Sequence, residues 1–334
     1  MKILPIFLPQ MGCINKCVFC DQRSTTGSSK VPDLSQLDDL VKDYRLSLEH
    51  FEIAFYGGTF TGLDETLQLL YLDWANKYIK DGACVGIRIS TRPDQIDERK
   101  IEFLKAHNVT FIEMGVQSFD DEVLKRSYRG HTVRDIENAC KIMKDTQMDF
   151  GLHLMVGLPG DDEQKDLYSA WRVVESGAKT CRIHPTLVLK DSILSQFYAA
   201  GEYEPLEINR AIDICSKMVG ILQSHGVKVI RIGLFIPSDL EKNIVAGPYH
   251  PRFGELVKID LMKKVVSYLK PDKIFYTPKQ RGLLRAINLQ AQMDEEFGFL
   301  VSGRFLKWKD ALVEYISGGV HDVRTAEKGC SAKN

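Results

Sequence analysis

Residues 110–116 read Thr-Phe-Ile-Glu-Met-Gly-Val, a short run rich in β-branched and aliphatic side chains, and Asp120 to Lys125 begins a stretch of helical spacing. A short apolar run of this kind is typical of a buried strand, and an aspartate ahead of an apolar-periodic stretch is typical of a helix start. The same order of strand and helix recurs on both sides of this segment. Such alternation predicts a parallel sheet covered by helices.

Working outward from this segment, we predict six strands, each followed by helical material: Lys2 to Pro9, Glu52 to Tyr56, Cys84 to Ser90, Thr110 to Val116, Asp149 to Val156 and Thr180 to Leu189. Asp64 and Asp97 stand where helices should begin, and Asp161 with Asp162 precedes a helix expected over Glu163 to Ser176. The pattern predicts an α/β fold, a partial (β/α)6 barrel of the TIM type.

The rhythm changes after Leu189. A helix is expected from about Glu207 to Ser224 and a strand over Val227 to Leu234, before a Pro/Gly-rich stretch at residues 246–254. The final segment mixes an amphipathic helix with a short strand, Lys273 to Tyr276, and a frayed tail beyond Gly318. We therefore expect a barrel with its extension over residues 1–235 and a C-terminal α+β accessory cap over residues 236–334.

The composition sets limits on partners and location. Lys plus Arg (44) nearly balance Asp plus Glu (45), for a net charge of −1, so no global positive field points to nucleic acid. No apolar run approaches the roughly 18 residues of a membrane span. The start, Met1 to Gln10, is too short and proline-broken for a signal peptide. We expect a cytoplasmic protein without membrane contact.

Cys13, Cys17 and Cys20 follow the first predicted strand with the spacing C-x3-C-x2-C. Three thiolates on one tight loop can bind three corners of a 4Fe-4S cube and leave the fourth iron open to another ligand, such as the methionine moiety of S-adenosylmethionine. The alternatives are a structural zinc knuckle, which normally requires a fourth ligand, or three unrelated thiols. The other five cysteines are scattered singly, as expected of free thiols in a protein core: Cys84, Cys140, Cys181, Cys215 and Cys330.

This loop resembles the signature of radical S-adenosylmethionine enzymes, including an aromatic residue, Phe19, just before the third cysteine. The resemblance implies a 4Fe-4S cluster and S-adenosylmethionine as cofactors, Phe19 against the adenine, and a reducing partner such as flavodoxin or ferredoxin. Core packing is the ordinary alternative for Phe19 taken alone.

Polar and glycine residues follow the predicted strand ends, where active sites of such barrels form. These candidate S-adenosylmethionine contacts are Gly57, Gly58 and Thr59 after the second strand, Ser90 and Thr91 after the third, Gln117 after the fourth, and His153 and Leu158 on or after the fifth. Arg129 could pair with the methionine carboxylate. Each of these residues also has a purely structural explanation. The glycines could form a turn, and the polar residues could simply end a strand. His153 could be a core residue, and Arg129 could lie at the surface.

The whole series of motifs resembles the radical domain of the catalytic subunit of Elongator, over roughly residues 1–235, and the looser frame is shared with oxygen-independent coproporphyrinogen oxidase. Elongator's subunit modifies tRNA with the help of an acetyltransferase domain and a basic N-terminal extension. Nothing in this sequence resembles either, so we do not expect the acetyl-dependent reaction. We expect hydrogen abstraction from an unidentified substrate, with tRNA or another nucleotide favoured.

Two alternatives stay open at this point: a tetrapyrrole oxidase or haem-handling protein, and a non-catalytic Fe-S sensor or chaperone. One further segment, Gly247 to Glu255, packs Tyr249, His250 and Arg252 among residues that restrict the chain. It is either a rigid connector or a lid whose three side chains contact substrate at the barrel mouth.

Overall fold

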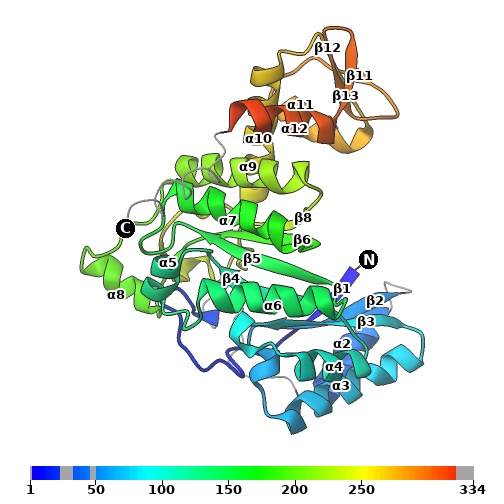
Figure 1. Cartoon of the computed structure of the whole chain (residues 1–334), viewed down its shortest axis with the longest axis vertical. Helices are drawn as coiled ribbons and strands as arrows, with labels where there is room; N and C mark the ends of the chain where they lie inside the picture. The colour runs from blue at the N-terminus through cyan, green and yellow to red at the C-terminus, as the bar shows by residue number, and fades with distance from the viewer. Residues whose placement is uncertain (1, 23–32, 46–49, 321–334) are drawn as a thin grey trace.

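The computed structural model describes residues 2–22, 33–45 and 50–320. Its main sheet has seven parallel strands in the order β1-β2-β3-β4-β5-β6-β8. The strands are β1 (Lys2–Phe7), β2 (Phe51–Tyr56), β3 (Cys84–Thr91), β4 (Val109–Gln117), β5 (Phe150–Val156), β6 (Thr180–Pro185) and β8 (Lys228–Ile232). The sheet curls, with helices along its outer face (Figure 1), which confirms the predicted α/β partial barrel.

The sheet extends one strand beyond the six that the sequence predicts for the barrel. Strand β8, within the predicted Val227 to Leu234 segment, pairs in parallel with β6 and forms an edge of the sheet. The predicted Thr180 to Leu189 strand ends earlier, at Pro185, whose ring removes the backbone donor that a continuing ladder would use. A separate two-residue strand, β7 (Val188–Leu189), then pairs antiparallel with β9 (Ile244–Ala246).

Aspartates cap the helices at the predicted positions. The side chains of Asp64, Asp97 and Asp162 accept hydrogen bonds from backbone N–H groups of the first turns, at 2.8–2.9 Å. The helices around the barrel are α2 (Leu34–Arg45), α3 (Glu65–Lys80), α4 (Glu98–Ala106), α5 (Asp121–Arg126), α6 (Val133–Asp145), α7 (Glu163–Ser176), α8 (Ile193–Ala199) and α9 (Ile208–Ser224). The sequence therefore predicts both the first and the last residue of α7 correctly.

Side chains alternate strictly along the central strands, because successive residues point to opposite faces of a sheet. On β4, Ile112 and Met114 are fully buried and belong to the apolar core under the helices. Each such side chain contributes about 1.5 to 3 kcal/mol to folding. The alternate residues, Glu113 and Gly115, face the opposite side, the concave interior of the barrel, which we call the lumen. The core thus lies outside the sheet, and the lumen is left to polar groups.

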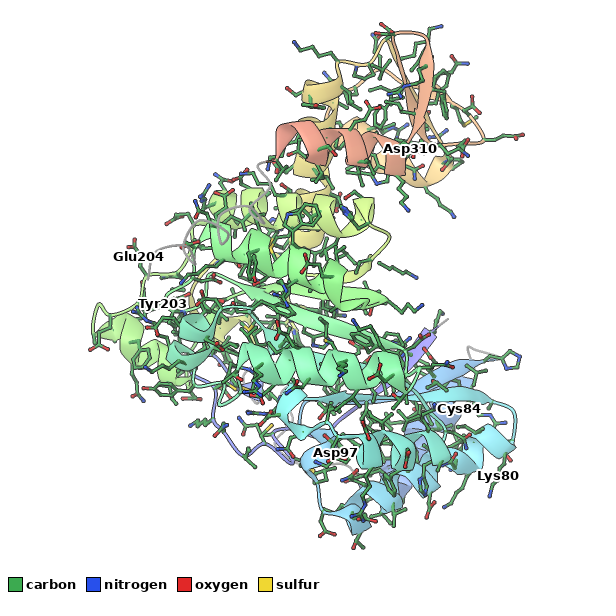
Figure 2. The ribbon with its side chains drawn as sticks, in the orientation of Figure 1. Lys80, Cys84, Asp97, Tyr203, Glu204 and Asp310 are labelled. Carbon is green, nitrogen blue, oxygen red and sulfur yellow. The ribbon has the colours of Figure 1, made fainter. Side chains whose placement is uncertain are left out.

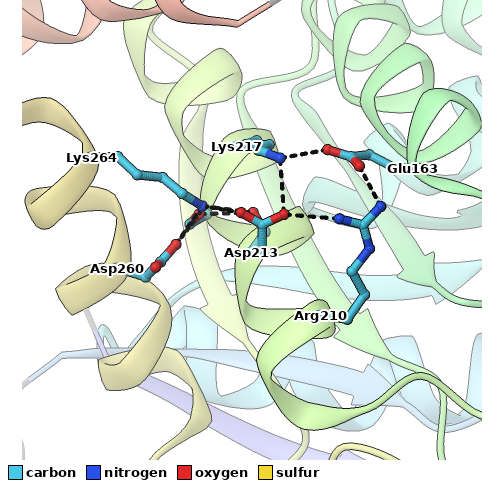
Figure 3. Close-up of polar contacts among 7 residues, drawn as sticks. Glu163, Arg210, Asp213, Lys217, Asp260 and Lys264 are labelled. Carbon is cyan, nitrogen blue, oxygen red and sulfur yellow. Dashed lines mark hydrogen bonds and ion pairs between the residues drawn. The ribbon is translucent and has the colours of Figure 1, made fainter. Parts of the chain in front are cut away.

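The C-terminal part consists of helices on one side of the barrel and a small four-stranded sheet beyond them (Figure 1). Its elements are α10 (Phe253–Leu269), β10 (Lys273–Tyr276), α11 (Arg281–Ala286), β11 (Gln292–Met293), β12 (Gly298–Val301), β13 (Arg304–Lys307) and α12 (Trp308–Gly319). Ion pairs join α10 to α9, and α9 to α7 (Figure 3). The predicted frayed tail lies almost wholly outside the described residues.

Two smaller predictions can be checked here. Cys84, Cys140, Cys181 and Cys215 are free and buried, as expected, whereas Cys330 lies outside the described residues. Among the described helices, none combines the length and the apolar character that crossing a membrane requires.

Candidate active site

Cys13, Cys17 and Cys20 lie on the loop that directly follows β1. The backbone N–H of Cys20 donates to the carbonyl of Cys17 (3.1 Å), which closes a tight turn. Gly12 has a φ of +70°, and a Cβ there would stand 2.2 Å from the carbonyl oxygen of Thr59. Only glycine therefore permits this loop to press so closely against the segment after β2.

The three thiols lie near one another at the mouth of the barrel. Cys17 is buried, Cys20 half-buried and Cys13 exposed, with its Sγ 3.3 Å from Thr59 Oγ1. Burial, together with the charges of Cys17 and Cys13, raises the pKa of Cys20 to about 12. In the part of the chain that is described, no three His, Cys, Asp or Glu side chains gather as the ligands of a single ion would. Three thiolates on one loop would repel one another, and a multinuclear iron centre is a group that can bind all three and neutralise their charge.

Arg129 connects this loop to the end of β4. It is buried, and its Nη1 donates to Cys17 Sγ (3.0 Å) while Nη2 donates to the carbonyl of Gly115. Its Nε is buried without a partner among the described residues. Arg129 is therefore not a surface residue, because its side chain is buried, and its guanidinium can stabilise a thiolate at Cys17.

The backbone of the segment that follows β2, from Gly57 to Thr59, lies against the cysteine loop. Gly57 has a φ of +92°, and a Cβ on Gly58 would stand 2.3 Å from the carbonyl of Met11. Thr59 is buried beside Cys13. Close packing against the cysteine loop therefore requires glycine at position 58, and the left-handed backbone favours glycine at position 57, in addition to any role in binding a ligand.

The ends of β3 and β4 place the remaining polar candidates. Ser90 is half-buried, and Thr91 is buried with its hydroxyl hydrogen-bonded to Thr61. Gln117 is buried with a φ of +71°, a left-handed conformation that costs a non-glycine residue on the order of 1–3 kcal/mol. Strain of this kind at a strand end is typical of a functional site.

Phe19 and Leu158, which come from the first and fifth strand ends, meet in one apolar cluster with Val123 and Met155. Tyr203 closes the same end of the barrel, since its hydroxyl donates to the carbonyl of Gly157 (2.7 Å). Figure 2 shows Tyr203 at the end of the barrel opposite Cys84, where β3 begins. The loops after the strands therefore hold an apolar wall next to the cysteines.

Glu113 is the main feature that sequence reasoning missed. It is completely buried on β4, and three lumen side chains bind its carboxylate: Tyr56 Oη donates at 2.6 Å, His153 Nε2 lies at 2.6 Å and Arg182 Nη2 donates at 2.9 Å. Burial alone would raise the pKa of Glu113, but His153 and Arg182 hold it well below its usual range. The signal in the sequence is a glutamate inside an otherwise apolar strand.

Comparison with known proteins agrees with this geometry. The Radical SAM superfamily matches residues 7–168, which include the cysteine loop and strands β2 to β5, and the Radical_SAM C-terminal domain matches residues 178–263. The chain belongs to the radical SAM superfamily. Superfamily membership implies a 4Fe-4S cluster and S-adenosylmethionine, the cofactors that the sequence predicts.

Among radical SAM proteins, this chain is similar to the tRNA uridine(34) acetyltransferase of Methanocaldococcus jannaschii, with 31% identity over 62% of this chain and 41% of that protein. It is 26% identical to Elongator complex protein 3 of Schizosaccharomyces pombe over 58% of this chain and 39% of that protein. The solved structure of Methanocaldococcus infernus Elp3 with an N-terminal deletion matches with a TM-score of 0.63 and 26% identity, over 79% of this chain and 63% of that one. The chain thus spans less than two thirds of these relatives.

The three candidate substrate residues of this radical SAM chain make contacts of their own. Tyr249 Oη donates to Glu241 (2.9 Å), Arg252 pairs with Glu255 at the surface, and His250 Nδ1 accepts from the Arg252 backbone (3.0 Å). The start of the segment does approach the strand ends, because Gly247 packs against Thr186 and Leu187 just beyond β6. A lid role for this segment stays a prediction.

Proposed function

We propose that Cys13, Cys17 and Cys20 hold a 4Fe-4S cluster whose fourth iron binds S-adenosylmethionine. A cluster bound there would supply the electron that splits the sulfonium into methionine and a 5'-deoxyadenosyl radical, which abstracts hydrogen from substrate. The observation that carries this proposal is the meeting of three neighbouring thiols with the buried guanidinium of Arg129 at the mouth of the barrel.

The chain's own residues would then bind and orient S-adenosylmethionine. The apolar wall of Phe19 and Leu158 would receive the adenine, and backbone carbonyls near Gly57 and Gly58 would accept from the ammonium group. The remaining polar contacts would come from Thr59, Ser90, Thr91, Gln117, Arg129 and His153. Arg129 would reach the carboxylate with its unpartnered Nε.

The substrate class is proposed from relatives. Curated proteins similar to this chain are named tRNA uridine(34) acetyltransferases, which favours tRNA or another nucleotide as the molecule that loses hydrogen. We further propose a cytoplasmic flavodoxin or ferredoxin as the reductant. Residues 236–334 would form an accessory region, with Tyr249, His250 and Arg252 near the substrate.

The test is anaerobic reconstitution of the cluster, followed by an assay for 5'-deoxyadenosine with and without bulk tRNA. We expect slow formation with reductant alone and faster formation with tRNA. A cluster that forms while no 5'-deoxyadenosine appears would identify a sensor instead of an enzyme. Stimulation by small-molecule pools but not by tRNA would reject the tRNA substrate while keeping the enzyme.

A further inference from the structure

The lumen of the barrel contains more positive than negative charge. Arg88 Nε pairs with Glu52 (2.7 Å), and Arg182 pairs with Glu113 (2.9 Å). Strand β8, at the edge of the sheet, adds a third guanidinium, Arg231, which is exposed to solvent and for which no hydrogen bond or ion pair exists among the described residues. Among the described residues, two carboxylates therefore face three guanidinium groups in the lumen.

Arg231 points into the lumen. It stands opposite Arg182 in the parallel pairing of β6 and β8, so the two side chains share one face of the sheet. Arg182 itself reaches Tyr56 on β2 (3.1 Å), which fixes that face as the inner one. Partial burial lowers the pKa of Arg231, and repulsion from Arg182 lowers it further. Without an added anion, the two cations oppose each other.

His184 provides a second unsatisfied group in the same place. It lies two residues after Arg182 on β6, and its ring centroid is 6.0 Å from that of His153, which binds Glu113. Its Nε2 is buried and has no partner among the described residues. A buried polar atom of this kind costs stability unless a ligand or water satisfies it.

We propose that the lumen binds one oxyanion group of the substrate, a carboxylate or a phosphate, between Arg231 and His184. The planar fork of Arg231 would take two oxygens, and the neutral imidazole of His184 would donate from Nε2. The anion would also separate the two guanidinium groups electrostatically. Its assignment to the substrate rests on the proposed radical chemistry, whereas the binding site itself does not.

The site uses residues of β6 and β8, whereas the proposed S-adenosylmethionine contacts lie on other strands and loops, and the two sets adjoin where the ring centroid of His184 lies 6.0 Å from that of His153. Strand β8 is an edge strand of the sheet, and β1 is the other edge. A substrate anchored at Arg231 would therefore lie beside the open side of the barrel, with the cysteine loop at its mouth.

The experiment is calorimetric titration of the full chain, with its cluster reconstituted, using inorganic phosphate and acetate as probes. Arg231→Gln should weaken binding of the preferred probe by about tenfold or more. Arg231→Lys, which keeps the charge and loses the fork, should give an intermediate affinity and covers the case in which Gln disturbs the fold. Arg134→Gln, an exposed arginine on the outer helix α6, is the control of equal charge change and should bind as the unmodified chain does.

Each possible result of these titrations either supports the anion site or overturns it. Tighter phosphate binding that depends on Arg231 supports a phosphate-bearing substrate, and tighter acetate binding a carboxylate. Equal losses in the Arg231 and Arg134 variants, or no binding of either probe, would overturn the site. A parallel titration with S-adenosylmethionine that weakened equally in Arg231→Gln would place Arg231 in that site and overturn the proposal. Anion binding through Arg231 in a chain that forms no 5'-deoxyadenosine would reject the radical chemistry and leave the anion site standing.

Discussion

Two charge networks on opposite faces of the sheet differ in how they balance. The outer one joins α7, α9 and α10 through three acidic and three basic side chains, Glu163, Asp213, Asp260, Arg210, Lys217 and Lys264 (Figure 3). These side chains are 22–50% exposed, and each one pairs within the group. The inner network centres on Glu113, which is fully buried, and leaves Arg231 without a partner among the described residues.

The two networks differ in charge balance more than in the number of ion pairs. We infer that the balanced outer network stabilises the fold and that the unbalanced inner network binds a ligand. A closed and half-exposed set contributes modestly to stability and positions α10 against the barrel. The inner set joins a fully buried carboxylate to an exposed cation, Arg231, that has no partner among the described residues, and an accessible unpaired guanidinium of this kind is available to bind an anion. The mouth and lumen should therefore govern chemistry, and the outer network only stability.

The largest effect should come from the mouth. Replacing Cys13, Cys17 and Cys20 by alanine should abolish the cluster and all S-adenosylmethionine cleavage, because the iron would lose its protein ligands. Iron and sulfide analysis and the absorbance spectrum measure this directly. The control is Cys140→Ala, which removes a buried thiol of α6 and should lower stability while keeping the cluster. A four-iron cluster in the triple variant would contradict the assignment.

Next in size is the loss of the inner carboxylate. Glu113→Gln should lower the free energy of unfolding by about 3–5 kcal/mol, because it leaves Arg182 buried with its charge unpaired. Urea denaturation of the full chain measures it. The control is Glu137→Gln, which removes a half-exposed partner of Arg172 and should cost less than about 1 kcal/mol. Equal costs for both variants would show that the lumen is as well solvated as the surface.

What the sequence predicted depends on how local each signal is. The cysteine spacing and the Asp64, Asp97 and Asp162 caps lie within a few residues of what they determine, so the loop and helix starts follow directly. The Glu113 network does not, because Tyr56 and Arg182 are 57 and 69 residues away and meet only when the sheet curls. The small C-terminal sheet was equally hard to predict, since β11 has only two residues.

The clearest pH dependence should come from a carboxyl pair at the start of α7. Burial raises the pKa of Asp161 to about 6, and burial together with the charge of Asp161 raises that of Asp166 well above its usual range. Both groups hold protons in the folded chain that the unfolded chain releases above about pH 4. The contribution of this pair to stability should therefore be fully present below about pH 4 and be lost as pH rises through 6 and beyond.

Asp166→Asn should flatten that decline. The amide keeps the shape and cannot ionise, so one of the two buried acids no longer resists the change to higher pH. Chemical denaturation at pH 5 and pH 8 gives the difference in unfolding free energy for each protein. A slope in the variant as steep as in the unmodified chain would assign the pH dependence to other groups.

The smallest effect should come from the outer network. Asp213 accepts from Lys264 (2.6 Å) and Lys217 (2.9 Å), and it pairs with Arg210 at 3.2 Å, yet its side chain is 30% exposed. Asp213→Asn should therefore cost only about 1 kcal/mol, because solvent screens these pairs and the asparagine oxygen still accepts a hydrogen bond.

Raising the salt concentration to about 1 M should remove most of this difference in unfolding free energy. The loss in Glu113→Gln should persist, because buried charges are screened much less. Hydrogen exchange should rise first in α10, which Asp213 holds against α9 through Lys264. The cluster and anion binding should be unchanged. A loss comparable to that of Glu113→Gln, or one that salt does not alter, would erase the distinction between the two networks.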